Sequence, residues 1–157
     1  MLKIRENKTR KKLRITQCVL FLLEILFCAF SFIHIPNPEG GWGFHATVID
    51  MFGYIGGSIP AGSEGEAFSA VIPFFFIFPV LPIIGFFFCA LDKERNMKNV
   101  VSILICLLGV FAILNIIPLN FLDYGSTFAL LGYILISFIS AIAIMARFSD
   151  NSDSKSK

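Results

Sequence analysis

Four long apolar blocks, separated by short polar or charged stretches, are the feature that most limits how this chain can fold. They cover residues 15–35, 67–91, 99–117 and 124–146. Each is close to the roughly 20 residues that an α-helix needs to cross the hydrocarbon core of a bilayer. Because no water reaches the backbone inside that core, a segment of this length spans it as a helix. The sequence therefore predicts an all-α integral membrane protein, a bundle of four transmembrane helices with a structured extracytoplasmic loop between the first two.

The overall composition agrees with a membrane protein. Of the 157 residues, 56% are hydrophobic and 15% are charged, whereas a soluble domain has about 45–50% apolar and about 25% charged residues. The first apolar block follows a basic N-terminus, as in a signal peptide. However, it is longer than a signal-peptide core, and no small-residue cleavage site follows it. We therefore expect it to remain in the mature protein as the first span.

The charged residues predict the orientation in the membrane. All 13 Lys and Arg residues lie before the first block, in the turn at 92–98, or after the fourth block. The charged residues of the two loops on the opposite side are all acidic, namely Glu39, Asp50, Glu64, Glu66 and Asp123. Cytoplasmic loops are enriched in Lys and Arg, so both termini are predicted to be cytoplasmic in a multi-pass protein of the cell membrane. Because each basic cluster adjoins a membrane segment, we expect it to contact lipid rather than nucleic acid.

The predicted order of segments follows from these boundaries. It is a basic cytoplasmic N-terminus (1–14), a first span (15–35), an extracytoplasmic loop (36–66), a second span (67–91), a cytoplasmic turn (92–98), a third span (99–117), a short outer loop (118–123), a fourth span (124–146) and a disordered cytoplasmic tail (147–157). Pro73, Pro79 and Pro82 remove backbone hydrogen bonds in the second span and predict a kink there. The tail is rich in Ser, Asp, Asn and Lys, a composition typical of disorder.

The first outer loop is long enough to hold structure of its own. Apolar side chains in it recur at the spacing of one helical face: Phe44, Val48, Met51, Phe52 and Ile55. Trp42 and Tyr54 are suited to the interface between lipid and water. We favour a short amphipathic helix lying on the outer surface. A small hairpin is the alternative, because the loop also contains β-branched residues and glycines.

A polar stripe in the first block is the strongest functional candidate. Gln17, Glu24 and Ser31 recur every seven residues and so lie on one face of a helix. An ionised carboxylate at mid-membrane costs about 2.5–3.5 kcal/mol or more, so we expect Glu24 to face other helices. Three roles are open for Glu24. The first role is a hydrogen-bonded contact between helices, and the second is a proton or cation site of a transporter. The third is a contact to a transmembrane residue of a partner protein.

Other polar residues give weaker signals. Asn115, near the outer end of the third block, is a secondary candidate for a helix contact or for lining a site. The four cysteines all lie inside apolar blocks and form no C-x-x-C pair, so neither a disulfide framework nor a zinc site is expected. The sequence shows no nucleophile–base pair, P-loop or metal-ligand spacing. We therefore expect no cofactor, no metal and no enzymatic activity.

These observations favour a small non-enzymatic membrane protein that acts through contacts between helices. Such a protein would be an accessory subunit of a membrane complex or an immunity-type protein. Its partners would be the lipid bilayer and either another membrane protein or a second copy of itself. The alternative is a small oligomeric secondary transporter or channel, with Glu24 as the site that couples transport to protons or cations.

Overall fold

The structure of the chain is a computed structural model. It describes residues 8–37, 43–55, 70–91 and 97–153. The predicted interfacial residue Trp42 lies outside these ranges. So do the first residues of the basic N-terminus, parts of the outer loop, most of the central turn and the last residues of the tail.

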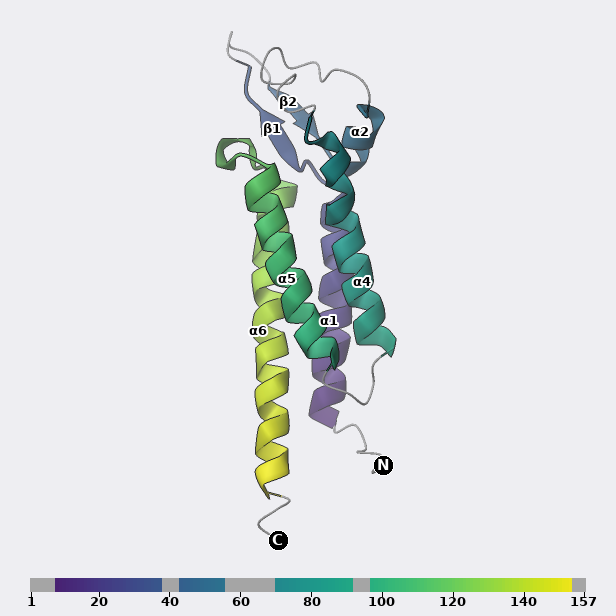
Figure 1. Ribbon diagram of the computed structural model, residues 1–157, viewed down its shortest axis with the longest axis vertical. Coiled ribbons are helices and arrows are strands. Elements are labelled where there is room, and N and C mark those ends of the chain that lie inside the picture. Colours follow the sequence, from purple (N-terminus) through teal and green to yellow (C-terminus); the bar gives the residue numbers. More distant parts are fainter. Residues whose placement is uncertain (1–7, 38–42, 56–69, 92–96, 154–157) are drawn as a thin grey trace.

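Four long helices stand side by side and form the body of the molecule (Figure 1). They are α1 (Lys8–Phe27), α4 (Ile77–Leu91), α5 (Met97–Ile116) and α6 (Tyr124–Asp153). α1 packs between α4 and α6, and α5 contacts the same two helices. α1 begins and α6 ends at one end of this bundle, whereas two short strands and the short helix α2 lie at the other end (Figure 1).

Three segments of the described chain are long and apolar enough to cross a membrane. They are Ile72–Leu91, Met97–Ile116 and Tyr124–Ala146. Large apolar side chains such as Phe111 and Phe138 are exposed on them, as the surface of a helix in lipid requires. α1 is not among the three, because Lys and Arg residues occupy its first two turns. Three of the four predicted spans therefore have the properties of membrane helices.

The first helix ends earlier than the sequence predicts. α1 stops at Phe27, and the end of the first apolar block forms strand β1 (Ile33–Ile35). Ile33 and Ile35 are buried, and His34 between them is only partly covered. This alternation and the proline that follows favour an extended chain over a helix. The prediction of one helix over residues 15–35 is wrong for this reason.

A small folded unit, which we call the cap, covers one end of the bundle. In it, β1 pairs antiparallel with β2 (Phe44–Ala46), and α2 (Val48–Gly53) follows directly. Thr47 and Asp50 start α2 with a capping box, in which the Asp50 N–H donates to Thr47 Oγ1 at 3.0 Å. The segment predicted as the outer loop thus contains strand β2 where the predicted helix begins and the short helix α2 over its middle. The strand pair differs from the hairpin alternative, because β2 pairs with residues of the predicted first span. The two-stranded sheet also corrects the all-α prediction.

The other boundaries differ from the sequence in smaller ways. The second predicted span is a 3-10 helix, η1 (Ile72–Phe76), that continues into α4, and Pro82 lies inside α4. The short loop at 118–123 contains a 3-10 turn, η2 (Leu119–Phe121). α6 runs to Asp153, so the prediction of a disordered tail is wrong for residues 147–153.

Candidate functional site

Glu24 lies in the interior of the four-helix bundle. It is on α1, and only 2% of its surface is exposed. Neither carboxylate oxygen has a hydrogen-bond partner among the described residues. Gly132 of α6 lies directly opposite, and a Cβ atom there would overlap with Oε1 of Glu24. The missing side chain at Gly132 therefore makes room for the carboxyl group.

The helical spacing of α1 explains why Glu24 points inward. Gln17, Phe21 and Glu24 follow one another at intervals of three or four residues, and all are buried. Residues at this spacing share one face of a helix. Phe21 lies against Gly85 of α4, whereas Glu24 lies against Gly132 of α6. This part of the predicted polar stripe therefore faces the chain's own bundle.

Gln17 belongs to a second buried polar cluster, nearer the end at which α1 begins. Its Nε2 donates to Asn99 Oδ1 at 3.1 Å and to Ser140 Oγ at 2.7 Å. Asn99 comes from α5 and Ser140 from α6, so three helices meet at Gln17. The sequence places Asn99 and Ser140 inside apolar blocks, which is a weak signal, but it does not show that they meet. Neither residue is among the predicted site residues.

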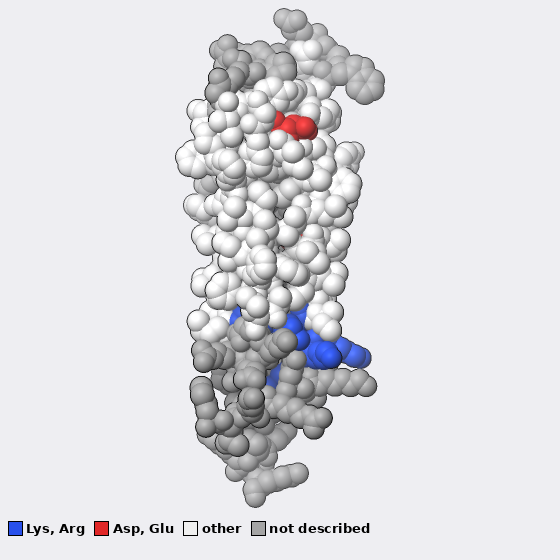
Figure 2. Space-filling view, turned by 90° about the vertical axis from the view of Figure 1, so that its right-hand side faces the viewer, with Lys and Arg blue, Asp and Glu red and all other residues white. Residues whose placement is uncertain are grey.

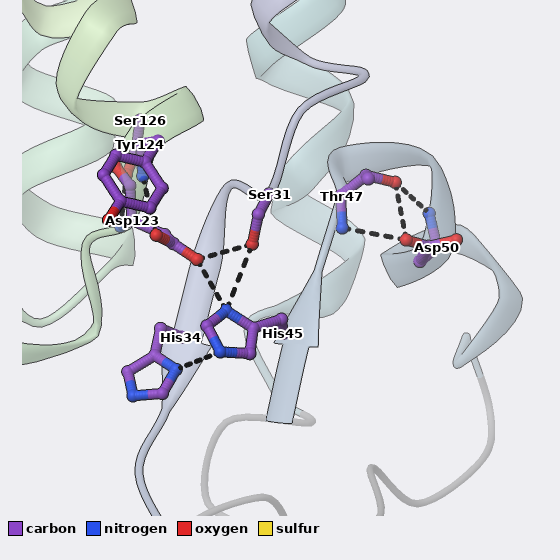
Figure 3. A network of polar contacts seen from close by, with 8 residues as sticks. All are labelled: Ser31, His34, His45, Thr47, Asp50, Asp123, Tyr124 and Ser126. Carbon is purple, nitrogen blue, oxygen red and sulfur yellow. Dashed lines mark hydrogen bonds and ion pairs between the residues drawn. The ribbon is translucent and has the colours of Figure 1, made fainter. Parts of the chain in front are cut away.

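Ser31, the third residue of the predicted stripe, is not on α1, because the helix ends at Phe27. Its hydroxyl group donates to Asp123 Oδ2 at 2.5 Å and lies 3.4 Å from Nδ1 of His45 (Figure 3). The same Nδ1 is 2.8 Å from Asp123 Oδ2. The prediction that Ser31 shares a helical face with Glu24 is therefore wrong. Ser31 instead ties the turn after α1 to β2 and to the start of α6.

Asp123 is the acceptor at the centre of this contact. Burial raises the pKa of Asp123, but hydrogen bonds from Ser31, His45 and the Tyr124 N–H outweigh it and hold the pKa below its ordinary value. Across the sheet, Nε2 of His45 lies 3.0 Å from Nδ1 of His34 (Figure 3). We call Ser31, His34, His45 and Asp123 the cap junction. The four residues come from three separate parts of the chain, at 31–34, 45 and 123, and no spacing rule predicts that these parts meet.

The remaining predicted residues have local roles. Asn115 is exposed, and its side chain donates to a carbonyl of its own helix at 2.7 Å. Phe44 packs edge-on against Tyr54 with ring centroids 5.7 Å apart, and Phe52 stacks on Phe76 at 4.6 Å. These three predicted aromatic residues therefore hold the cap together and join it to η1.

Polar groups thus occur at three levels along the contact between α1 and α6. The levels lie at Asp123, directly before α6, at Gly132 of α6, which faces Glu24, and at Ser140 of α6. At a helical rise of 1.5 Å per residue, they are separated by roughly 13 Å and 12 Å. Glu24 occupies the middle level. We call this series the polar axis.

Neither the described side chains nor the comparisons with known proteins assign a function to the chain. Within residues 8–37, 43–55, 70–91 and 97–153, no group of three or more His, Cys, Asp or Glu side chains is arranged to hold a metal ion. No protein family, curated protein or solved structure matches the chain.

Proposed function

We propose that this chain is a small four-span transporter or channel of the cell membrane in which Glu24 binds the proton that accompanies transport. One observation carries the proposal: Glu24 is buried inside the bundle, and both of its carboxylate oxygens lack a partner among the described residues. An ionisable group at membrane depth is costly, and such groups commonly mark the path of an ion or a proton.

The distribution of charge supports the topology of this proposal. Lys and Arg side chains gather at the end of the bundle opposite the cap, and acidic side chains are visible near the cap (Figure 2). In a membrane, the end rich in Lys and Arg faces the cytoplasm. Both termini are then cytoplasmic, and the cap is extracytoplasmic.

The apolar part of the first helix is shorter than the three later apolar segments. In α1 this part, from Ile15 to Phe27, provides about 20 Å of helix at 1.5 Å per residue, against about 30 Å of hydrocarbon. Long Lys and Arg side chains at the start of α1 reach toward the lipid headgroups. After Phe27 the backbone is covered by the cap, since the Phe32 N–H donates to the Ala46 carbonyl at 2.8 Å. A non-helical backbone is tolerated at membrane depth where protein covers it in this way.

The surroundings of Glu24 support one of the three roles that the sequence leaves open for it. A structural contact between helices needs a hydrogen bond, and the carboxylate makes none to a described residue. Contact with a partner's transmembrane residue needs an accessible side chain, and Glu24 is 2% exposed. A metal cation needs several oxygen ligands, and the residue facing Glu24 is Gly132. A proton needs one oxygen and removes the cost of the buried charge, so it fits the site best.

Polar groups on both sides of Glu24 support a route for protons. The cluster of Gln17, Asn99 and Ser140 lies toward the basic end of the bundle, and the cap junction lies toward the cap. The separations of roughly 12–13 Å along the helices are far longer than a hydrogen bond. Transfer between the levels therefore requires water to enter the bundle during a transient opening.

Proton flux into liposomes tests the proposal. Vesicles that contain the wild-type protein and a pH-sensitive dye are given an inside-negative potential and a pH gradient. Glu24→Gln keeps the size and polarity of the side chain but cannot ionise, so we expect the flux to fall by about tenfold or more. Asp50→Asn is the matched control, because Asp50 is an exposed acid of the cap. Its flux is expected to equal that of the wild type.

Two outcomes would count against the proposal. Equal flux in the wild type and in Glu24→Gln would reject Glu24 as the coupling group. A wild-type flux no higher than that of empty vesicles would reject the transporter class. The infrared band of a protonated carboxyl group gives an independent check of the site, because it should disappear in Glu24→Gln.

A second candidate function is the contact protein that the sequence favours, and one feature of the cap supports it. Ile49 on α2 is 62% exposed. It borders an open hollow of about 400 Å³ lined by Phe44, His45, Ile49, Asp50, Gly53 and Tyr54. An apolar side chain beside a hollow suits the extracytoplasmic segment of another membrane protein. A photoreactive residue at position 49 should then crosslink one partner in intact cells, and a failure to crosslink would reject this function.

A further inference from the structure

We propose that His34 and His45 form a binding site for a divalent transition-metal ion of the Zn²⁺ type on the outer face of the cap. The site is separate from Glu24 and does not depend on the transport proposed above. Its ligands are two imidazole nitrogens, and water completes the coordination of the ion.

The two histidines are brought together by the pairing of the strands. The chain contains only two histidines, and they are direct partners across the β1–β2 sheet. Nδ1 of His34 and Nε2 of His45 lie 3.0 Å apart, and the ring centroids are 4.2 Å apart. Two imidazole nitrogens that converge on one point form a chelating pair, and imidazole is the side chain that Zn²⁺, Cu²⁺ and Ni²⁺ share as a ligand.

Asp123 prepares His45 for this role. Its Oδ2 lies 2.8 Å from Nδ1 of His45 (Figure 3), and a carboxylate only accepts hydrogen bonds, so Nδ1 carries the proton. In the neutral ring, the lone pair of Nε2 is then directed toward Nδ1 of His34. A carboxylate behind a histidine is the usual second contact of a metal-binding imidazole, and it fixes the tautomer and the ring orientation. Ser31 also donates to this oxygen, at 2.5 Å, and so helps to hold the carboxylate in place.

The distances fit a metal ion after a small adjustment. Two nitrogens bound to Zn²⁺ at about 2.0–2.1 Å in a tetrahedral arrangement are roughly 3.3 Å apart. The observed 3.0 Å therefore has to widen by a few tenths of an ångström. The side chain of His45 is 49% exposed, so an ion can reach the site from water.

Proton balance is also satisfied when the ion binds. Without metal, one ring nitrogen of the pair donates a hydrogen bond to the other. Because Nδ1 of His45 carries the proton of that ring, the donor is the Nδ1–H of neutral His34. When the ion takes the place of this hydrogen, the proton of His34 moves by exchange with water to Nε2, the nitrogen that faces away from His45. Metal binding at neutral pH therefore needs a change of tautomer at His34 and no net release of protons.

Selective labelling of histidine with ¹⁵N tests the proposal directly, because only two residues give ring signals. The full chain, free of any polyhistidine tag, is placed in lipid nanodiscs and titrated with Zn²⁺. We expect His45 to carry its proton on Nδ1 before Zn²⁺ is added. Zn²⁺ should then shift the signals of His45 Nε2 and His34 Nδ1 together, at one ion per chain. Unchanged ring signals at millimolar Zn²⁺ would show a pair that only shares a proton, and the proposal would be wrong.

Variants separate the metal site from the fold and from the proposed transport function. His34→Gln removes one ligand but leaves the His45–Asp123–Ser31 contacts intact, and it should abolish one-to-one binding. Asp123→Asn should weaken Zn²⁺ binding by about 10–100-fold. Glu24→Gln should bind Zn²⁺ as the wild type does, so a failure of the transport proposal leaves this one standing. Unchanged Zn²⁺ affinity in His34→Gln would overturn the assignment of the ligands.

Discussion

Glu24 on α1 and Gly132 on α6 face each other inside the bundle, and the position of each depends on the other. The carboxyl group occupies the space that a side chain at position 132 would fill. Glu24 stands out in the sequence, because it is an acid in an apolar block. Gly132 does not, because glycine is common in transmembrane helices and its spacing does not show which helix it faces.

The first prediction concerns this close contact. Gly132→Ala places a Cβ atom against Glu24 Oε1, and we expect the overpacking to lower the free energy of unfolding by about 1–3 kcal/mol. Thermal unfolding in detergent measures the change. Gly53→Ala is the control, because an added Cβ there meets no atom within 4 Å, and its stability should change by less than about 0.5 kcal/mol. If the two variants unfold alike, the contact between α1 and α6 is not as described.

Asp123 gives a prediction of pH dependence. Its pKa is lower in the folded chain than its ordinary value, so the ionised form is bound more tightly by the folded state. The contribution of Asp123 to stability is therefore complete above the unfolded pKa of about 3.9 and is lost as the pH falls through the lower folded value. The melting temperatures of the wild type and Asp123→Asn, measured with EDTA, should show their full difference at every pH above about 5 and converge as the pH falls below about 4. A difference that is constant with pH would contradict this.

At the scale of elements, the end of α1 shows where local patterns stop being sufficient. The apolar block from residue 15 to residue 35 has one hydropathy signal but two structures, a helix to Phe27 and the strand β1. Hydropathy does not separate them, because Ile and Phe suit both a buried strand and a membrane helix. The pairing with strand β2 determines that residues 33–35 are extended. β2 lies later in the sequence and supplies hydrogen-bond partners to the extended backbone of β1.

The short helix α2 depends on its capping box, and this leads to a third prediction. Thr47→Ala removes the acceptor for the Asp50 N–H, and we expect a local loss of about 0.5–2 kcal/mol. Hydrogen exchange at the Asp50 amide should accelerate accordingly. Thr127→Ala, a change at an exposed position of α6, serves as the control and should leave that exchange rate unchanged. Slow exchange at Asp50 in Thr47→Ala would mean that packing of Val48 and Met51 holds α2 by itself.

Viewed as a whole, the molecule is a bundle with a basic end, a folded cap at the other end, and polar groups between them along the α1–α6 contact. The basic end and the apolar helices follow from the sequence, since hydropathy and charge are properties that add up over a segment. The polar axis does not follow from the sequence. The contacts of Asn99, Ser140 and Gly132 depend on which helix each of them faces, and only the packing of the helices determines that.

The fourth prediction tests the sidedness of the whole molecule. Asn120→Cys lies at the cap end and Lys12→Cys at the basic end, and both positions are exposed. In intact cells, a maleimide that cannot cross membranes should label Asn120→Cys, whereas Lys12→Cys should react only after the cells are permeabilised. The wild type measures the background from the native cysteines, of which Cys28, Cys89 and Cys106 are buried. The reverse labelling pattern would contradict the proposed topology.

The sequence by itself determined the membrane class, the apolar extent of the three later spans, the basic end, and Glu24 as the residue to examine. These follow from segment hydropathy, from the placement of Lys and Arg, and from the cost of a charge in lipid. Only the tertiary structure decided that Glu24 faces Gly132 and that Gln17 contacts Asn99 and Ser140. It also decided that His45 lies between His34 and Asp123 and contacts both. The physical reason is that helical spacing defines which face of a helix is buried, whereas the packing of distant segments selects the neighbour that the face contacts.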